Sequence, residues 1–452
     1  MGTKVQLVAK QLESHSMVIP PGLAKALGMD ASTAQVRLHF GVSSQKMNIR
    51  VSSQLRQGEI HISTDSVDRL AIPLQPRYEL RRNENGIYLG PFIGFLLTHP
   101  SKNVEQYLPY LNDYLPLYDQ VGGAIVAFAL GDVDRQTDRL RGFVYDPDKK
   151  GWESGVYGVP SSLFIKTAML SPRDLRYFET KMGKTVFNNF NLNKWEMDQV
   201  LSQTGLKKHL PKSKLYKQVE DLQSLLKSKQ PVYLKPINGS RGYAVARISK
   251  NKKGISMRFR SDQKNEKLVF KTFDDLHKFL RRSIRPKTFM IQRAVDLLVE
   301  GGRIIDFRMI MVKDERGKWE DVGLVSRFGP TNSVVSNISA GGTAELGEQT
   351  LQRLFNLSAD ELIEWRKRLS RIAHQVGRCL DKSGLHCGNM GVDFGIDKKG
   401  RIWILEIQHN NPDHTLALDA SAFELYEQIL RKHLLYLKGL AGFSARERAE
   451  DG

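Results

Sequence analysis

Residues 391–409 have the sequence GVDFGIDKKGRIWILEIQH, in which two alternating apolar segments flank a four-residue polar turn. Alternation with period two on both sides of a turn predicts an antiparallel hairpin. In the register set by this turn, Asp393 lies opposite Ile404, so that Asp393 and Glu406 are diagonal neighbours on one face. Two converging carboxylates repel each other unless one is protonated or a cation bridges them, and Mg²⁺ is a cation that prefers oxygen ligands. The hairpin therefore predicts a magnesium site, with a chance acidic pair as the alternative.

A glycine-bounded loop lies upstream, where residues 232–248 have the sequence VYLKPINGSRGYAVARI. The segment predicts a strand, a loop and a second strand, and Lys235 lies at the end of the first strand. The loop comprises Gly239, Ser240, Arg241 and Gly242. Its glycines let backbone N–H groups approach an anion without obstruction by Cβ atoms, and Lys235 can reach the same anion. The loop fits neither the Walker A nor the Rossmann spacing, and an ordinary hairpin turn is the alternative.

Two further predicted strands carry polar residues in apolar surroundings. Gln292 interrupts the apolar run Thr288–Val295, and its amide must find hydrogen-bond partners there. A contact to the edge of a purine is the functional interpretation, and a satisfied edge residue is the alternative. In Ile304–Val312 the alternation places Asp306 and Arg308 on the face opposite the apolar set. They form either the wall of a site or an ordinary ion pair facing solvent.

The positive charge of the chain is concentrated in one block. The 452 residues carry 68 basic and 49 acidic side chains, a net charge of +19. Residues 205–287 hold 23 of the basic and 6 of the acidic residues (net +17), which leaves 45 and 43 (net +2) for the rest of the chain. Such a block indicates an anionic partner, and a solvated lysine-rich surface is the alternative.

The composition excludes several classes of protein. No apolar run is long enough to span a bilayer, and the first residues show no secretory signal. The two cysteines, Cys379 and Cys387, cannot form a disulfide framework, and their spacing from nearby histidines matches no zinc site. The sequence shows no Ser-His-Asp or nucleophilic cysteine motif either. We therefore expect a cytoplasmic protein with no membrane partner.

The chain divides by pattern into four segments, of mixed α/β and α+β character. We expect a β-rich accessory domain at 1–85, an α/β domain at 86–188, a larger domain of helices and antiparallel strands at 189–440, and a polar tail at 441–452.

Local patterns locate several buried strands and helix starts. The apolar runs Tyr88–Leu97 and Ala124–Leu130 predict parallel strands, with a crossover helix within Asn103–Tyr114. Asn193 and Ser358 each precede a glutamate by three residues, which predicts the capped start of a helix at each position.

Six short motifs follow one another along the chain. They are Asn193-Lys-Trp195, Leu234-Lys-Pro-Ile-Asn-Gly-Ser-Arg-Gly242, Ile291-Gln-Arg293, Asp306-Phe-Arg308, Ser336-Asn-Ile-Ser-Ala-Gly-Gly342, and Gly391-Val-Asp393 with Ile404-Leu-Glu406. In this order they resemble the ATP-grasp superfamily, and specifically its endospore-coat-associated YheC/YheD branch. The run Gly90–Phe95 also resembles the opening of the domain that precedes the grasp module. The likeness covers about residues 86–435, and six weak motifs in one order are together specific.

The resemblance implies a fold and an activity. It implies an ATP-grasp fold, in which ATP lies between two α+β lobes, preceded by a pre-ATP-grasp α/β domain and the small β-rich domain. The family's reaction activates a carboxylate: ATP phosphorylates it, and an amine or thiol then attacks the acyl phosphate. Such chemistry requires positioned charge and no protein nucleophile. The implied cofactors are ATP and Mg²⁺, and the implied location is the spore coat.

The matching positions imply roles for individual residues. The phosphates, the covering loop and adenine would involve Lys194, Lys235, Gly239, Ser240, Arg241, Gly242, Gln292, Arg293 and Ala294. The transferred phosphate and the acceptor would lie near Arg308, Arg327 and Asn337. Mg²⁺ would be bound by Asp393, Glu406 and Gln408. The family's usual third metal ligand is Asn, and the Gln408 carbonyl is one methylene further from the backbone, so the metal geometry must shift.

Three functions stay open from the sequence. The first is an ATP- and Mg²⁺-dependent carboxylate–amine ligase, whose carboxylate and amine substrates the sequence does not name. The second is a catalytically silent, ATP-binding structural or assembly protein of the spore coat, which Gln408 favours. The third, nucleic-acid binding through the basic block, is weaker because no nucleic-acid-binding motif accompanies the charge. Besides ATP, the partners that we expect are spore-coat proteins and an acidic molecule or surface.

Overall fold

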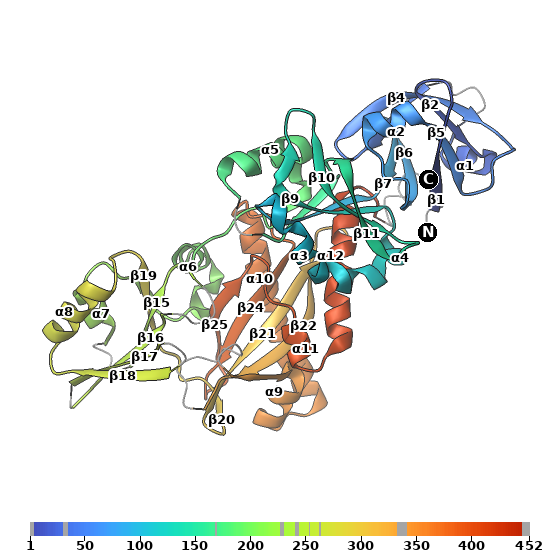
Figure 1. Cartoon of the computed structure of the whole chain (residues 1–452). Helices are drawn as coiled ribbons and strands as arrows, with labels where there is room; N and C mark the ends of the chain where they lie inside the picture. Colours follow the sequence, from blue (N-terminus) through green and yellow to red (C-terminus); the bar gives the residue numbers. More distant parts are fainter. Residues whose placement is uncertain are drawn as a thin grey trace. The chain divides into compact units, whose positions relative to one another are not determined.

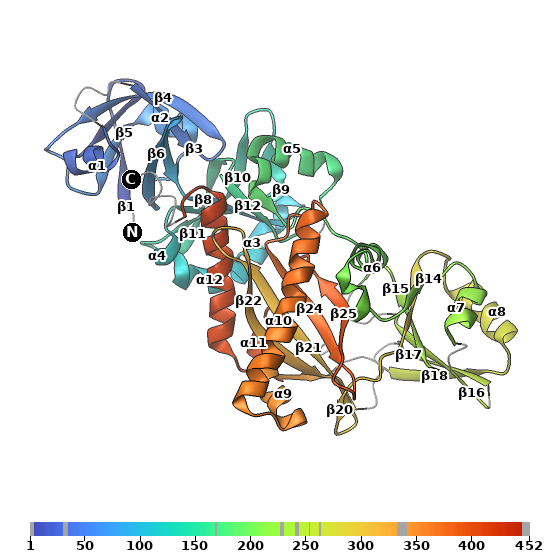
Figure 2. The same cartoon turned by 180° about the vertical axis from the view of Figure 1, so that it is seen from behind.

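The computed structural model describes residues 4–29, 35–167, 170–226, 230–239, 244–252, 254–261, 264–331 and 341–444. The chain forms two compact units, each of them discontinuous in sequence. The first unit comprises Met1–Phe190, Lys313–Lys318 and Ile429–Gly452, and the second comprises Asn191–Val312 and Trp319–Gln428. Figures 1 and 2 show the elements of both units from opposite sides. In the described part of the chain, no helix has the length and apolar character needed to cross a bilayer.

The first unit begins with a closed β-barrel. Its strands are β1 (Lys4–Lys10), β2 (Ser16–Ile19), β3 (Gln35–Phe40), β4 (Ser43–Val51), β5 (Glu59–Ser63), β6 (Arg77–Asn83) and β7 (Gly86–Gly90), and its helices are α1 (Pro21–Ala26) and α2 (Thr64–Leu70). The strand order is β1-β5-β2-β4-β3-β7-β6. Alternate residues such as Met47 and Ile49 are buried in the barrel, together with Phe40 and Tyr78. The β-rich fold predicted for the N-terminal region is confirmed.

A mixed sheet follows in the first unit, with the order β11-β10-β9-β8-β12-β13. Its strands are β8 (Phe92–Thr98), β9 (Ala124–Asp134), β10 (Arg139–Asp146), β11 (Gly151–Gly158), β12 (Ser162–Ile165) and β13 (Val186–Phe187), and α5 (Pro172–Met182) and the 3₁₀ turn η3 (Gly183–Thr185) join the last two. Strand β8 pairs in parallel with β9 and with β12. The parallel pairing predicted from the buried apolar runs is therefore confirmed.

Prolines account for two differences from the predicted elements. The run predicted as one strand is divided at Pro91 into β7, which belongs to the barrel, and β8, which belongs to the sheet. The predicted crossover helix is instead a chain of short turns, η1 (Ser101–Asn103), α3 (Val104–Tyr107), η2 (Leu108–Leu117) and α4 (Tyr118–Val121). Pro109 and Pro116 lie in this segment, and proline removes a helical N–H donor and ends regular helix.

The last described residues of the chain belong to the first unit. They come from the second half of α12 (Phe423–Leu440) and the turn after it. Lys438 Nζ donates a hydrogen bond of 2.7 Å to Glu79 Oε1, and both side chains are largely buried. The Tyr114 hydroxyl lies 2.9 Å from Nδ1 of His433, which is also buried. Residues from the last helix of the described chain therefore pack against the N-terminal barrel and its adjoining sheet within the first unit.

The second unit contains an antiparallel sheet of order β14-β19-β15-β16-β17-β18. Its strands are β14 (Ser213–Leu215), β15 (Val232–Pro236), β16 (Ala246–Asn251), β17 (Gly254–Ser261), β18 (Lys264–Phe270) and β19 (Phe289–Arg293). Helices α7 (Val219–Leu226) and α8 (Phe273–Ser283) lie together on one face of this sheet (Figures 1 and 2). The pairing of β15 with β16 confirms the strand–loop–strand prediction for residues 232–248. We call this sheet with its helices the basic lobe, because residues 205–287 form most of it.

The second sheet of this unit has the order β23-β22-β21-β24-β25, and β20 pairs with β21. Its strands are β20 (Val299–Glu300), β21 (Arg303–Lys313), β22 (Trp319–Phe328), β23 (Thr343–Leu346), β24 (Asn389–Ile396) and β25 (Ile402–Gln408), and the other helices of the unit are α6 (Lys194–Ser202), η4 (Gly205–His209), α9 (Gly347–Phe355), α10 (Ala359–Lys382) and α11 (Leu416–Asp419). Helix α10 buries its apolar stripe against this sheet. The predicted cap at Ser358 is confirmed, since its Oγ accepts a hydrogen bond of 3.3 Å from the backbone N–H group of Glu361.

Gly377 lets α10 approach β22 closely. A Cβ atom at this position would lie 2.6 Å from the indole ring of Trp319. The Trp319 Nε1–H group donates a hydrogen bond of 2.9 Å to Asp381, which fixes the ring against the helix. Packing therefore requires glycine here, although glycine is a poor helix former.

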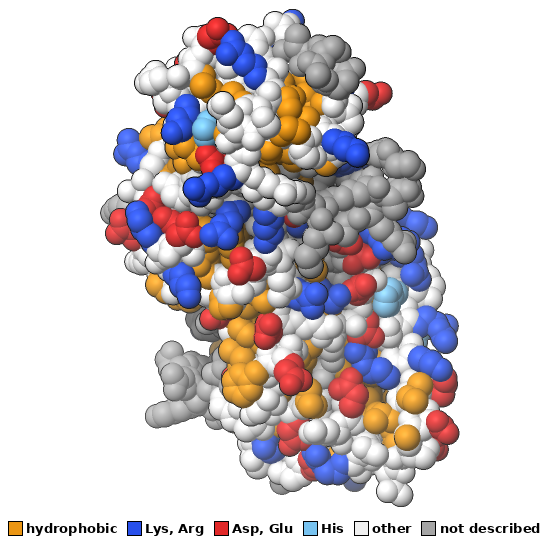
Figure 3. Space-filling view, turned by 90° about the vertical axis from the view of Figure 1, so that its right-hand side faces the viewer, with side chains coloured by type: hydrophobic (Ala, Val, Ile, Leu, Met, Phe, Trp, Pro, Cys, Tyr) orange, Lys and Arg blue, Asp and Glu red, His pale blue; other side chains and the backbone are white. Residues whose placement is uncertain are grey.

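The positive charge of the chain is unevenly distributed between the basic lobe and the other residues. Figure 3 shows acidic and basic side chains mixed over the face that it draws. Outside residues 205–287 the numbers of basic and acidic residues are nearly equal, 45 and 43. Most of the excess positive charge therefore belongs to the basic lobe.

Candidate functional site

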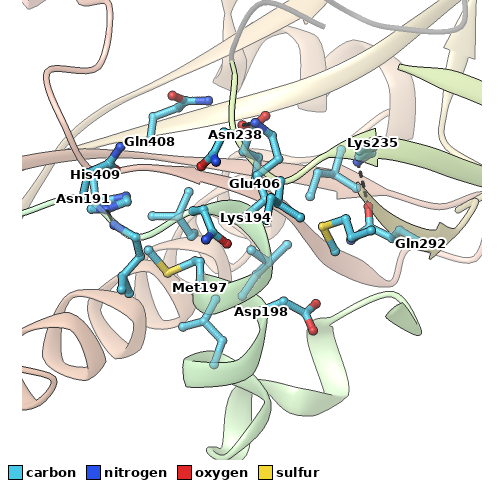
Figure 4. A pocket seen from close by; sticks show the side chains of 18 of the residues that line it. Asn191, Lys194, Met197, Asp198, Lys235, Asn238, Gln292, Glu406, Gln408 and His409 are labelled. Carbon is cyan, nitrogen blue, oxygen red and sulfur yellow. Dashed lines mark hydrogen bonds and ion pairs between the residues drawn. The ribbon is translucent and has the colours of Figure 1, made fainter. Parts of the chain in front are cut away.

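A cavity of about 330 Å³ lies in the second unit. It is lined by α6, by β15 and β19 of the basic lobe and by β25 of the second sheet. Six of the predicted site residues line it: Lys194, Lys235, Gly239, Gln292, Glu406 and Gln408. Figure 4 shows Lys194, Asn238 and Glu406 between the Lys235–Gln292 pair and the side chain of Gln408. The structure thus gathers residues that lie up to 214 positions apart in sequence, from Lys194 to Gln408, around one space.

Lys235 and Gln292 come from neighbouring strands of the basic lobe. Leu234 points to the core beneath α7 and α8, so the alternation of β15 turns Lys235 to the other face. Lys235 Nζ donates a hydrogen bond of 2.7 Å to Gln292 Oε1, and Gln292 Nε2 lies 3.4 Å from Ser213 Oγ. Burial lowers the pKa of Lys235, and nearby Glu406 partly opposes this shift. Gln292 is therefore satisfied by protein partners and lines the cavity as well.

Lys194 joins three parts of the cavity. It is the first residue of α6, whose start is fixed because Asn193 Oδ1 accepts two backbone amides of the first turn, each at 3.0 Å. This capping box confirms the predicted helix start. Lys194 Nζ lies 3.2 Å from Glu406 Oε1 and also donates a hydrogen bond to the carbonyl of Gly239. The lysine thus connects the helix, the beginning of the glycine loop and the acidic strand.

Two titratable residues that line the cavity, Asp198 and His409, were not predicted as site residues. Asp198 follows Lys194 by four positions, a spacing that places both on one face of α6. Burial raises the pKa of Asp198, and a hydrogen bond with Ser213 opposes this shift. His409 is buried, and its Nε2 accepts the backbone amide of Leu192 at 2.9 Å. Burial lowers the pKa of His409, which favours the neutral form that can accept this bond.

The hairpin of β24 and β25 forms as predicted, but the predicted register is wrong. Ile396 pairs with Ile402, one residue beyond the partner in the predicted register, and Leu405 is an additional residue in β25, since Phe394 pairs with Ile404 and Asp393 with Glu406. Such an insertion is a β-bulge, and it shifts all pairs beyond it. The two carboxylates consequently stand directly opposite each other and not diagonally, which brings them closer than the predicted register allows.

Asp393 belongs to a buried cluster of four charged residues, in which each side chain is at most 9% exposed. Arg308 donates to both Asp393 oxygens at 2.7 and 2.9 Å, and Arg327 donates to both Asp306 oxygens at 2.6 and 3.0 Å. Arg327 Nη2 also lies 2.8 Å from Asp393 Oδ2. Burial alone would raise the pKa of Asp393, but the two arginines hold it below its ordinary value. The alternative prediction, that Asp306 and Arg308 form an ordinary ion pair facing solvent, is therefore wrong.

The described residues contain no group of three or more His, Cys, Asp or Glu side chains able to hold a metal ion. Of the oxygen donors that the sequence predicted for Mg²⁺, Glu406 and Gln408 line the cavity, and Asp393 lies opposite Glu406 on the adjacent strand. Carboxylate and carbonyl oxygens suit Mg²⁺, which usually takes one or two carboxylates and fills its shell with water and phosphate oxygens. The donor set therefore fits Mg²⁺ in ligand chemistry, although Asp393 is shared with two arginines.

The structure does not bring every predicted residue to the cavity. Arg293 and Ala294 do not line it, and their backbone amides donate to carbonyls of the basic lobe. Arg308 and Arg327 lie in the buried cluster instead. Four predicted residues lie outside the described part of the chain: Ser240, Arg241, Gly242 and Asn337.

Sequence comparison finds relatives that cover about two thirds or more of the chain. A family model described as YheC/D-like ATP-grasp matches residues 183–440. The endospore coat-associated protein YheD of Bacillus subtilis (strain 168) is 24% identical over 383 residues, which are 81% of this chain and 82% of that protein. The endospore coat-associated protein YheC of the same organism is 21% identical over 296 residues, 64% of this chain and 80% of that protein.

Solved structures show weaker likenesses. D-alanine–D-alanine ligase from Bacillus anthracis has a TM-score of 0.42 and 15% identity, with 80% of this chain and 99% of that chain covered. N5-carboxyaminoimidazole ribonucleotide synthetase from Thermotoga maritima has a TM-score of 0.39 and 13% identity, with 75% of each chain covered.

Proposed function

Because the chain belongs to the YheC/D-like ATP-grasp family, we propose that it is an ATP- and Mg²⁺-dependent ligase that joins a carboxylate to an amine. The observation that carries the proposal is the cavity, where Lys194, Lys235 and Glu406 meet from a helix and two sheets. Phosphoryl transfer depends on cations placed around the phosphates, and this cavity offers two lysines and oxygen ligands for a divalent ion.

The two lysines would hold the phosphates of ATP. Each ammonium group has three N–H donors, so Lys235 can bind a phosphate oxygen while it keeps Gln292. Lys194 likewise keeps its contacts to Glu406 and Gly239 with one donor to spare. Gln292, held by Lys235 and Ser213, would present its amide to the edge of adenine.

Glu406 and Gln408 would hold Mg²⁺ from the cavity side, with Asp393 as the third oxygen donor. The ion would supply charge neutralisation at the transferred phosphate. The positions of Arg308 and Arg327 are fixed by their bonds to Asp393 and Asp306, so both guanidinium groups offer oriented positive charge beside this carboxylate.

The reaction that we propose has two steps. A substrate carboxylate attacks the γ-phosphorus of ATP, which forms an acyl phosphate and releases ADP. An amine then attacks the acyl carbon, so that an amide forms, inorganic phosphate leaves and the ammonium proton passes to solvent. Neither step needs a nucleophile from the protein, and the residues of the cavity act by binding and orienting charge.

Calorimetry with ATP in the presence and absence of Mg²⁺ tests nucleotide binding. We expect Lys235→Met to weaken binding at least about tenfold, the loss of one charge-assisted bond to phosphate. Lys278→Met, an exposed lysine on α8, is the matched control and should bind as the wild type does. Glu406→Gln should reduce the Mg²⁺ dependence of ATP binding more than the binding without Mg²⁺. Equal affinity in Lys235→Met and wild type would refute the proposal.

A product screen tests ligation itself. The protein is incubated with ATP, Mg²⁺ and mixtures of amino acids and peptides, and ADP release is measured together with the mass of any joined product. ADP formation that requires both a carboxylate and an amine supports the ligase, and Glu406→Gln should abolish it.

A second candidate is an ATP-binding assembly protein of the spore coat without turnover. The favouring observation is that both oxygens of Asp393 are bonded to arginines, which leaves fewer free donors for a metal ion. The relatives named endospore coat-associated support a location at the coat for either candidate. ATP binding with no ADP release in the complete product screen would favour this second function.

A further inference from the structure

One residue from each strand of the basic lobe belongs to a row that crosses the sheet perpendicular to its strands. Neighbouring strands place these residues directly opposite one another: Ser213, Gln292, Tyr233, Arg247, Arg258 and Lys267. Directly opposite residues share one face of a sheet. This is the face away from α7 and α8, because the adjacent residues Val232, Ile248 and Met257 pack under those helices. We call Arg247, Arg258 and Lys267 the cation row.

The cation row starts beside the cavity. Gln292 lines the cavity, and Lys235 Nζ, another lining group, lies 5.5 Å from the centre of the Tyr233 ring. The Tyr233 side chain is in turn hydrogen-bonded to Arg247. Neighbouring strands are about 4.8 Å apart, so Lys267 lies roughly 19 Å from Gln292, at the edge strand β18. A continuous path of cationic and polar groups therefore leads from the sheet edge to the cavity.

The charges of the row are not balanced within the described part of the lobe. Like charges directly opposite each other destabilise a sheet, and here Arg258 has a cation on each side. Among the described residues, no carboxylate forms an ion pair with any member of the row. The acidic residue that the described part of β15 to β18 contains is Glu266, and it stands opposite Phe259, which packs on the helix-covered face. The open face thus presents positive charge without interleaved negative charge.

We propose that the cation row binds an acidic polypeptide segment and guides its carboxylates to the cavity. This docking role rests on the proposed ligase function, in which a carboxylate substrate must enter beside ATP. Guanidinium groups bind carboxylates through paired hydrogen bonds, and the row offers two of them, one already oriented by Tyr233. The substrate class that follows is a protein or peptide rich in Asp and Glu.

The same face is poorly suited to single-stranded nucleic acid. Such ligands need aromatic platforms on which successive bases stack. The exposed outer part of the face carries Arg258, Lys267 and the aliphatic Val269, which is 57% exposed. The aromatic side chain of the row, Tyr233, lies at its inner end and is engaged by Lys235 and Arg247. Charge without stacking surface favours a polypeptide partner.

The test measures binding of a fluorescein-labelled oligoglutamate peptide to the full-length protein by fluorescence anisotropy at low and physiological salt. Arg258→Glu with Lys267→Glu reverses two charges of the row. Lys278→Glu with Arg282→Glu, two exposed positions on α8, makes the same change in net charge elsewhere on the lobe. We expect the row variant to bind at least about tenfold more weakly and the α8 variant to stay within about twofold of wild type. ATP binding, measured by calorimetry, should be unchanged in both variants, which also shows that they are folded.

Three outcomes would overturn the docking site: a wild type that binds ATP but not the peptide, equal losses in the two variants, or a labelled oligouridylate that binds through the row more tightly than oligoglutamate. Failure of the ligase proposal looks different. In that case the peptide still binds through the row, and neither ATP binding nor ADP release is observed.

Discussion

Arg327 bridges the two carboxylates of the buried cluster, and its replacement by methionine should strongly destabilise the second unit. It makes three charge-assisted contacts, two with Asp306 at 2.6 and 3.0 Å and one with Asp393 at 2.8 Å. At about 1.5 kcal/mol for each such bond the three amount to about 4.5 kcal/mol. Breaking a buried ion pair by removing one partner costs about 3–5 kcal/mol, in agreement with this sum. We therefore expect Arg327→Met to lower the free energy of unfolding of this unit by about 4 kcal/mol.

Urea unfolding followed by tryptophan fluorescence measures this change. In a Trp152→Phe background the signal comes from the second unit alone, which contains Trp195, Trp319, Trp365 and Trp403. Arg353→Met is the matched control, because Arg353 also binds two carboxylates but its side chain is 44% exposed. An exposed pair contributes about 0–1 kcal/mol, so the control should lose less than about 1 kcal/mol.

A double-mutant cycle separates the charge cluster from simple loss of packing. Asp306→Asn removes the charge of the carboxylate that loses two hydrogen bonds in Arg327→Met. The double variant should therefore lose less stability than the sum of the two single variants, by about 1–3 kcal/mol. An additive cycle, or an Arg327→Met loss no larger than that of Arg353→Met, would refute the reasoning.

Further predictions concern packing, capping and pH. Gly377→Ala should destabilise the second unit in thermal denaturation, because its Cβ would lie 2.6 Å from the Trp319 ring; a gain of about 1 kcal/mol, as in an exposed helix, would contradict the packing. Ser358→Ala removes the cap of α10 and should cost about 1 kcal/mol in urea unfolding, whereas an unchanged midpoint would exclude a contribution of the cap. Burial lowers the pKa of Lys166 to about 8 in the folded protein. Between about pH 8 and the pKa of an exposed lysine, the unfolded chain therefore binds more protons than the folded chain, and the free energy of unfolding rises with pH. Lys166→Met should remove this rise, at most about 3 kcal/mol, in unfolding of the first unit at pH 7 and pH 10, followed as the part of the tryptophan fluorescence change that Trp152→Phe removes; an identical rise in the variant would rule out Lys166 as its source.

The sequence predicted elements whose signals are local. The helix α10 is long, periodic and capped at Ser358, and these features lie within the segment itself. The same holds for the start of α6 at Asn193 and for the hairpin of β24 with β25. Proline signals in the crossover segment were also local, at Pro109 and Pro116, and they explain why the predicted single helix is divided.

Features that depend on strand order were not predictable in the same way. Alternation placed Asp306 and Arg308 on one face, but the identity of the elements covering that face is not encoded in the strand. Their burial results from the neighbouring strands β22 and β24, which supply Arg327 and Asp393. The bulge at Leu405 could not be predicted for a related reason. On each side of Leu405 the apolar and polar residues alternate as in a regular strand, and the extra residue becomes evident only from the pairing with β24.

The candidate site follows the same division. Sequence motifs identified six residues that line the cavity, because each motif lies at the end of a strand or helix facing it. The pairing of Lys235 with Gln292, and the participation of Asp198, required the relative placement of α6, β15 and β19. An i, i+4 spacing from Lys194 was the one visible signal for Asp198.

The interleaving of the two units has a consequence for biosynthesis. A ribosome releases the barrel and its adjoining sheet early, whereas Lys438 and His433, which contact Glu79 and Tyr114, emerge only after the entire second unit. During translation of the intervening residues, the nascent first unit therefore lacks the contacts that Lys438 and His433 make in the folded protein. Folding of the whole is expected to finish only when the C-terminal helix docks, so the second unit acts as an insertion that delays closure of the first.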